Sequence, residues 1–324
     1  MTERVAVVIP VYNERERLVE AVRSVVEGNE VSAKFYIVDD ASTDGTPDIV
    51  KKFLASENIP HEVFVNDESR GAGGCRNIGL DNVVEEYILF LDADDFLFPG
   101  ILDQTISLAD ESSSQVVITE YDRVYSENDK KLGMNHHDEM VFSRIKKMGL
   151  VSPFSINKAG FVLDLVNYPW NKIVSTSYAR EIGLRFSETP VHNDVFAHWQ
   201  LLMNASRISV MNQSLCGHRV SMRSNQITNI SDARRMAMLD VFNELEEYFN
   251  KESLFKERYY HFFVSFKIKL FRWGNARIDE GHKESFYEEF CKTFENMSKL
   301  DFLIVSERMP RVAVEALRYR LRLM

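Results

Sequence analysis

The first hundred residues alternate short apolar runs with segments whose apolar side chains recur at helical spacing. Four runs predict strands that are buried on both faces: Val5 to Ile9, Phe35 to Val38, Val63 to Val65 and Tyr87 to Leu91. Three helical segments separate them: one over Leu18 to Val26, one with Thr46 as its N-cap, and one over Gly74 to Asn82. Strand–helix–strand repetition predicts an α/β fold with a mostly parallel sheet flanked by helices.

The rest of the chain divides into a mixed middle and a helical end. Gln115 to Thr119 is expected to be a further strand, and the polar stretch Ser126 to Asp138 a loop or flap with solvated His136 and His137. From about Ser231 the pattern is helical, so we place a domain boundary near residue 225. The expected units are residues 1–225, with halves meeting at about residue 110, and a helical region over 226–324.

Charge and cysteine content exclude several classes of protein. The formal net charge is −10, which argues against a nucleic-acid partner because such proteins usually present a basic face. The three cysteines Cys75, Cys216 and Cys291 are too few and too scattered for a disulfide framework or a zinc finger. With neither a signal-peptide core nor a membrane span in view, we expect a cytoplasmic protein, at most peripheral at the inner face of the plasma membrane.

Polar residues follow three of the predicted strands. The first strand is followed by Pro10 to Glu14, the second by Asp39 and Asp40, and the fourth by Asp92 to Asp95. In open parallel sheets, ligands bind beyond the carboxyl ends of the strands, so these segments are expected to meet at one edge. Like charges gathered there repel one another unless a cation or hydrogen-bond donors balance them.

The acidic segments have both functional and ordinary interpretations. Carboxylates on a short loop such as Asp92 to Asp95 suit Mg²⁺ or Mn²⁺ shared with a diphosphate, although an acidic turn is equally compatible. Asp39 or Asp40 could accept a hydrogen bond from a nucleobase N–H or ribose hydroxyl; the alternative is an Asx-turn leading into the next helix.

A glycine-rich segment, Arg70 to Asn77, leads into the third predicted helix and opens it. It fits neither a dinucleotide fingerprint nor a P-loop, because the required third glycine and the Gly-Lys-Ser/Thr ending are missing. Arg76, expected on the first turn of the helix, could clamp a diphosphate. A flexible turn with a solvated arginine is the alternative.

Taken in order, these motifs resemble the family-2 glycosyltransferases of bacterial surface-glycan synthesis, over roughly residues 4 to 230. The matching segments are Val8 to Glu14, Val38 to Thr46, Arg76-Asn77-x-Gly79, Phe90 to Asp95, Trp170 to Lys172 and His192 to Phe196. Two positions depart from the family pattern: Cys75 replaces an alanine, and Asn193-Asp194 stands where Glu-Asp is usual.

The resemblance implies a GT-A fold in residues 1–225 and a metal-dependent, inverting hexosyl- or N-acetylhexosaminyltransferase. Its expected donor is a nucleotide-diphospho-sugar, with UDP the expected nucleotide, and its acceptor a glycan or a lipid-linked hydroxyl. The implied donor-binding residues are Pro10, Tyr12, Glu14, Asp39, Asp40, Arg76, Asp92, Ala93 and Asp94. The implied ligands of Mn²⁺ or Mg²⁺ are Asp94, helped by Asp92 and Asp95, with His218 as a further candidate.

The resemblance also assigns the second half of the site. Asp194 would be the general base, against the alternative of a helix N-cap. Trp170, Asn171, Lys172 and Asn193 would line the pocket for donor and acceptor, although a surface position is the default for a lysine. A packed or solvated histidine is likewise the ordinary interpretation of His218.

Near the end of the chain, five arginines from Arg308 to Arg322 interleave with apolar residues and a single glutamate. This helix could contact an anionic membrane or pack on the protein or on a second copy of it. The aromatic stretch from Phe262 to Trp273 is expected to be a packed core or a dimer surface.

Two further functions remain open at this point. A sugar-phosphate nucleotidylyltransferase would place a glycine-rich, arginine-containing loop directly after the first strand, where this chain has Pro10 to Glu14. A non-catalytic sugar-nucleotide or glycan-binding protein would keep the pocket but lose the metal or base residues, and both sets are present in this sequence.

Overall fold

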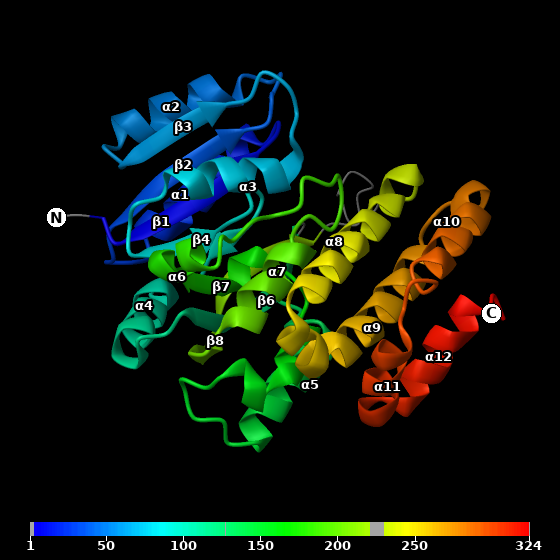
Figure 1. The fold of residues 1–324 in the computed structure, drawn as a ribbon. Coiled ribbons are helices and arrows are strands. Elements are labelled where there is room, and N and C mark those ends of the chain that lie inside the picture. The colour runs from blue at the N-terminus through cyan, green and yellow to red at the C-terminus, as the bar shows by residue number, and fades with distance from the viewer. Residues whose placement is uncertain (1–2, 127, 221–229, 324) are drawn as a thin grey trace.

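A computed structural model describes residues 3–126, 128–220 and 230–323 as a curled sheet flanked by helices, followed by a helical region (Figure 1). The strands are β1 (Val5–Val11), β2 (Ala33–Asp39), β3 (His61–Val65), β4 (Tyr87–Phe90), β5 (Phe96–Leu97), β6 (Val116–Tyr125), β7 (Lys172–Ser175) and β8 (Ile208–Val220). The helices of the α/β part are α1 (Arg15–Val26), α2 (Thr46–Ser56), α3 (Gly71–Asn82), α4 (Ile101–Ser112), α5 (His136–Lys147), α6 (Thr176–Glu181) and α7 (Val195–Asn204). The helices that follow are α8 (Met238–Lys251), α9 (Ser253–Asn275), α10 (Glu280–Lys292), α11 (Lys299–Arg308) and α12 (Pro310–Arg320).

The strands form one eight-stranded sheet in the order β3-β2-β1-β4-β7-β6-β8-β5. The first four strands pair in parallel, so their carboxyl ends meet at one edge as expected. β7 pairs antiparallel with both β4 and β6, which makes the far half of the sheet mixed. The predicted α/β fold is confirmed, and its parallel character belongs to the half that contains β1 to β4.

Two helices begin elsewhere than the sequence indicated. The N-cap of α2 is Gly45 in the left-handed region (φ +83°), and Thr46 is the first helical residue, so the predicted threonine N-cap was wrong by one position. Asp44 Oδ1 instead accepts from the amide of Thr46 at 2.9 Å. α3 begins at Gly71, three residues before the predicted start, and this places Arg76 beyond the first turn.

The polar segment after β6 is shorter than predicted. Asn135 caps α5 by accepting from the amide of Asp138 at 2.9 Å, so the helix already includes His136 and His137. Asp138 is fully buried and accepts from the Tyr121 hydroxyl at 2.7 Å. The predicted loop was therefore wrong over His136 to Asp138, and Asp138 is buried because a buried tyrosine gives its carboxylate a partner below the surface. The expected exposure of His136 is confirmed, since its side chain is 84% exposed.

The C-terminal helices share a core with the sheet. One cluster of buried side chains runs from Val8 in β1 through Phe242 in α8 to Tyr319 in α12. The rings of Phe271 and Phe290 stack at a centroid distance of 3.8 Å inside it. The boundary predicted near residue 225 lies outside the described residues, and the division into two units stays a prediction. Within the described ranges, no helix is both long enough and apolar enough to cross a bilayer.

Candidate active site

The loops that follow β1 and β2 lie side by side at the carboxyl edge of the sheet. The amide of Asn13 donates to Ser42 Oγ at 2.9 Å, and Asn13 Oδ1 accepts from the amide of Thr43 at 2.9 Å. Asn13 adopts a left-handed conformation (φ +53°), which lets the chain turn sharply after β1. Beside it, the ring of Tyr12 is 55% exposed, so this edge presents an aromatic face to solvent.

The other residues predicted in the first loop have different surroundings. Pro10 is buried inside β1, where it pairs with Val38. Glu14 lies at the start of α1, and its Oε2 is 4.0 Å from Nε of Arg17. Tyr12 and Glu14 are thus at the surface of this edge, whereas Pro10 shapes the strand below it.

Asp39 and Asp40 both lie below the surface at the end of β2. Asp40 accepts from the Ser69 hydroxyl at 2.6 Å and from the amide of Arg70 at 2.7 Å. Burial acts to raise the pKa of Asp40, but these hydrogen bonds outweigh it and hold the pKa below its usual value. Asp39 Oδ2 accepts from the amide of Ser42, while its buried Oδ1 has no partner among the described residues. Asp40 therefore anchors the glycine-rich segment, and Asp39 retains an unused acceptor.

The acidic segment after β4 forms a turn that is held by its own backbone and by residues of β8. The amide of Asp95 donates to the carbonyl of Asp92 at 3.1 Å. The Asp95 carboxylate is fully buried, accepts from the amide of Arg219 at 2.9 Å and pairs with Nδ1 of His218 at 3.0 Å. The ring of His218 stacks on Trp170 at 5.2 Å between centroids. Strand β8 thus holds this turn against the end of the sheet.

Asp94 stands apart in this cluster because, within the described ranges, no cationic group lies in close contact with its carboxylate. Its Oδ2 is 4.0 Å from Nη1 of Arg17, at the limit of an ion pair. Burial raises the pKa of Asp94 to about 7, and the negative charges of Asp95 and Asp92 add to the effect. A cation placed against this carboxylate would offset both contributions.

The predicted metal ligands are Asp94, Asp92, Asp95 and His218. In the described part of the chain, no group of three or more His, Cys, Asp and Glu side chains is arranged to hold a metal ion. Asp92 is engaged by Arg76 and Asp95 by His218, which leaves Asp94 as the available carboxylate. Mg²⁺ typically takes one or two carboxylates and completes its shell with water and substrate phosphates. The residues therefore fit a cation shared with a bound diphosphate, and the ligand set stays a prediction.

Arg76 connects two parts of the chain that are far apart in sequence. Its Nη2 donates to Asp92 Oδ1 at 2.6 Å, and its Nη1 donates to Asn193 Oδ1 at 2.7 Å, across 117 positions. The guanidinium is buried over the ring of Phe186, and its Nε has no partner among the described residues. The alternative of a solvated arginine is excluded, because this side chain is a buried link between the acidic turn and the segment that precedes α7.

Gly73 allows α3 to approach that segment closely. A Cβ at this position would lie 2.0 Å from the carbonyl oxygen of Ser187 and 2.9 Å from Cβ of Asn193. Because the first of these atoms belongs to the backbone, a side chain of any size forces the two segments apart. The glycines in this region thus serve packing as well as chain reversal.

Gly73→Ala is expected to reduce the free energy of unfolding by about 1–3 kcal/mol, because overpacking displaces the Ser187 backbone. Urea unfolding followed by circular dichroism measures this change. Gly281→Ala, on helix α10, is the matched control, since among the described residues its Cβ would meet only Asp279 Oδ1, at 3.6 Å. The control is expected to be neutral or stabilising by up to about 1 kcal/mol. Equal effects of the two substitutions would contradict the packing role of Gly73.

Asp194 lies directly before α7, at the N-cap position. Its side chain makes no capping hydrogen bond, so helix capping does not account for an aspartate here. Burial raises the pKa of Asp194 to about 6, while the positive charge of Arg76 acts in the opposite direction. The result is a carboxylate at the surface of the site that takes up a proton more readily than an exposed aspartate does.

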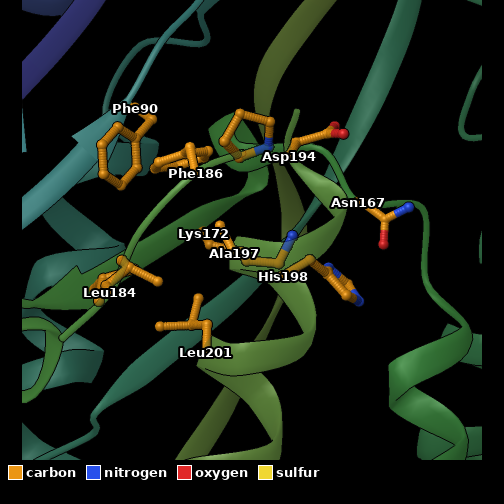
Figure 2. A pocket seen from close by; sticks show the side chains of 11 residues that line it. Phe90, Asn167, Lys172, Leu184, Phe186, Asp194, Ala197, His198 and Leu201 are labelled. Carbon is orange, nitrogen blue, oxygen red and sulfur yellow. The ribbon is translucent and has the colours of Figure 1, made fainter. Parts of the chain in front are cut away.

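A small cavity lies beneath Asp194, with Lys172 and His198 below it (Figure 2). Its volume is about 20 Å³, enough for about one water molecule. His198 and Asn167 both line this cavity. His198 Nδ1 and Asn167 Oδ1 are buried and have no hydrogen-bond partner among the described residues. Internal water molecules typically form hydrogen bonds with buried polar atoms of this kind.

Lys172 is a buried residue rather than a surface lysine, so the default expectation for it was wrong. Its Nζ donates to the carbonyl of Tyr168 at 2.5 Å and to Asn171 Oδ1 at 2.7 Å. Burial lowers the pKa of Lys172 to about 7, and the nearby charge of Asp194 partly restores it. Trp170 stacks on Tyr168 at 4.3 Å in the same segment. The Trp170–Lys172 segment thus packs beneath Asp194 and, through Trp170, against the ring of His218.

Sequence reasoning missed several residues that contact this site. Arg17, Asn167, His198 and Phe186 belong to no motif, and they reach the site only through packing of distant segments. Arg17 had one usable signal, because it lies one helical turn after Glu14 at the start of a helix that faces the acidic turn.

The sequence profile of glycosyl transferase family 2 matches residues 6–183, more than half of the chain. The chain belongs to glycosyltransferase family 2. Among curated members, glycosyltransferase GlyA of Streptococcus pneumoniae is 21% identical over 255 residues, which cover 75% of this chain and 34% of GlyA. The putative teichuronic acid biosynthesis glycosyltransferase TuaG of Bacillus subtilis is 33% identical over 117 residues, which cover 36% of this chain and 46% of TuaG. This family-2 chain thus matches half or less of the length of each of these relatives.

The family-2 chain also resembles a solved structure over nearly its whole length. The crystal structure of residues 1–349 of S. aureus TarS, in complex with UDP-GlcNAc, superposes with a TM-score of 0.74. The match covers 98% of this chain and 87% of that one at 17% identity. It confirms the predicted fold, including the helical region that follows the sheet.

Proposed function

We propose that this chain transfers a sugar from a nucleotide-diphospho-sugar to an acceptor hydroxyl, with inversion at the anomeric carbon. The observation that carries the proposal is the link through Arg76, which joins the acidic turn at Asp92 to Asn193, the neighbour of Asp194. A site for a leaving diphosphate and a candidate base are thereby held together, although they belong to distant parts of the chain. Membership of glycosyltransferase family 2 supports the same reaction.

The donor is assigned to the edge formed by the first two loops. The exposed side chain of Tyr12 offers a stacking face for a base. We assign the N–H of that base to Asp39 Oδ1, which is buried beneath this edge and has no partner among the described residues. We propose UDP as the nucleotide and a hexose or N-acetylhexosamine as the sugar. The TarS structures, which contain UDP-GlcNAc or UDP, support this choice through the shared fold.

The diphosphate is assigned to the acidic turn. Asp94 would hold Mn²⁺ or Mg²⁺ together with the diphosphate oxygens, with Asp92 and Asp95 around it. When bound, such a cation stabilises the negative charge that develops on the leaving diphosphate. Arg76 keeps Asp92 in place and contributes positive charge from beneath the turn.

Asp194 is assigned as the general base. A sugar or lipid-linked hydroxyl is a weak nucleophile, so a carboxylate within hydrogen-bond reach must accept its proton as the new bond forms. Inversion requires the base on the face opposite the leaving diphosphate, and a residue contributed by a separate segment can occupy that face. We place the acceptor in the synthesis of a bacterial surface polysaccharide or lipo-oligosaccharide, as the name of TuaG suggests.

The activity of this base predicts a pH dependence. Below the pKa of Asp194, about 6, the carboxyl is protonated and cannot accept the proton of the acceptor. We expect kcat/KM to fall about ten-fold per pH unit below that value and to level off above it. Lys172→Met should shift this acidic fall in kcat/KM to higher pH, because the positive charge of Lys172 favours the ionised form of Asp194. If kcat/KM fell at the same pH in this variant as in the wild type, Asp194 would not be the titrating group.

A donor screen tests the proposed reaction without a known acceptor. Purified protein with Mn²⁺ is incubated with UDP-, GDP-, CMP- and dTDP-linked sugars, and release of the free nucleotide is measured with water as the default acceptor. We expect slow release from a UDP-sugar, and proton NMR should show the released sugar first in the anomeric configuration opposite to that of the donor. Retention of configuration, or no release from any donor, would contradict the proposal.

A further inference from the structure

The last two helices carry apolar side chains on their outer surface. Of fifteen large hydrophobic side chains exposed in the described ranges, six lie within residues 300–323. Each is 45–67% exposed, and together they are Leu300, Leu303, Val314, Leu317, Leu321 and Leu323. Isolated exposed leucines are normal on a protein surface, whereas a group of them on α11, on α12 and directly after α12 is a candidate interaction site. We call this group the α11–α12 apolar face.

The pattern along α12 shows that this exposure is organised. Val314, Leu317 and Leu321 follow one another at spacings of three and four residues, which places them on one side of the helix. Ala313, Ala316 and Tyr319 are buried against the core, on the side of the helix next to this stripe. The apolar surface of α12 therefore extends from the buried side onto the side that faces solvent. α11 packs directly against it at the edge of the molecule away from β1 to β3 (Figure 1).

Basic side chains flank the apolar face. Residues 299–323 contain six Lys and Arg against three Asp and Glu, whereas the whole chain has 39 against 49. Two of those three acidic residues are already paired, Asp301 with Lys256 at 2.9 Å and Glu315 with Arg272 at 3.3 Å. Among the basic residues, Arg322 is paired with Glu288 at 3.1 Å and with Glu295 at 2.7 Å. Arg311 and Arg318 are exposed and have no ion-pair partner among the described residues. At helical spacing both lie on the same flank of the apolar stripe.

We propose that the α11–α12 apolar face docks on the surface of an anionic lipid bilayer. An apolar stripe beside arginines is the arrangement that lets a helix lie in the interface, with its leucines among the acyl chains and its guanidiniums at the phosphates. A second copy of this chain fits less well. A two-fold contact through α12 sets the same surface against itself and brings the arginines of the two copies together.

Flotation of the full chain with lipid vesicles tests this proposal. We expect binding to phosphatidylcholine vesicles that contain about one third phosphatidylglycerol, and a marked loss of binding in high salt or with phosphatidylcholine alone. Leu317→Ser combined with Leu321→Ser should weaken binding at least about ten-fold, because two apolar anchors are lost. Arg311→Gln combined with Arg318→Gln should weaken it about twenty-five-fold, at roughly five-fold per arginine.

Matched controls separate this face from general surface properties. Leu254→Ser removes an exposed leucine on α9, and Arg23→Gln removes an exposed arginine on α1; neither is expected to change vesicle binding. Circular dichroism and UDP binding, measured on every variant, show that the fold and the donor site are intact. The proposal is independent of the reaction, so it can fail while UDP binding persists. Absence of vesicle binding, binding retained in both double variants, or a dimer that Leu317→Ser dissociates would each overturn it.

Discussion

Asp194→Asn is expected to lower kcat about a thousand-fold, within the range that loss of a positioned general base produces. The asparagine has nearly the same shape and cannot accept the acceptor's proton. The substitution should leave the affinity for UDP unchanged within about two-fold, because we assign Asp194 to the acceptor side and no donor contact to it. Steady-state rates of nucleotide release, measured with a saturating donor, give the comparison.

Stability distinguishes this catalytic effect from misfolding. Burial raises the pKa of Asp194 to about 6, which means that the ionised carboxylate is less favourable in the folded chain than in the unfolded one. Above that pH, replacement by a neutral amide should therefore maintain or increase the free energy of unfolding. Asp48→Asn, on the exposed surface of α2, is the matched control and should keep full activity. A variant of Asp194 that keeps a tenth or more of the wild-type kcat would refute its role as the base.

Asp94→Ala is expected to reduce transfer by about a hundred-fold or more at any concentration of Mn²⁺. Among the described residues, Asp94 is the carboxylate of the acidic turn that no cationic group contacts closely, so its loss removes the site that a cation and a diphosphate would share. Initial rates measured against Mn²⁺ concentration test this. Wild type should show saturable activation that a chelator abolishes, whereas the variant should stay inactive.

The surroundings of Asp94 also predict what its loss does to the fold. Because Asp92 and Asp95 repel its charge, removal of this carboxylate should not lower the melting temperature. Asp48→Ala, on the exposed surface of α2, is the matched control for an exposed aspartate and should retain wild-type activation. Full rescue of the activity of Asp94→Ala by excess Mn²⁺ would show that other residues hold the cation. Wild-type activity that is unchanged by chelator would contradict metal dependence.

The sequence was sufficient to predict the half of the sheet that contains β1 to β4. A strand buried on both faces appears as an unbroken apolar run, and Val5 to Ile9 is such a run. The rule that ligands bind at the carboxyl ends of parallel strands then brought Asp39 and Asp92 to one edge without any coordinates. The short β7 and the bulged β8 gave no comparable signal, since their pairing depends on partners distant in sequence.

The interior of the site could not be predicted because it depends on long-range contacts. Nothing near Arg76 in the sequence indicates that it will donate to Asn193, and nothing near Gly73 indicates that Ser187 will lie against it. The same holds for Lys172, whose burial under Asp194 requires α7 and the Tyr168 segment to pack together. Local patterns identify residue types that suit a reaction, whereas packing decides which of them share a cavity.

Calorimetric titration of UDP tests the central claim, that Asp94 serves the diphosphate and Asp194 serves the acceptor. The titration is run with Mn²⁺, with Mg²⁺ and with chelator on wild type, Asp94→Ala and Asp194→Asn. We expect micromolar binding by wild type and by Asp194→Asn that collapses with chelator, and no measurable binding by Asp94→Ala. Equal UDP affinity in all three proteins, or affinity unchanged by chelator, would contradict the account.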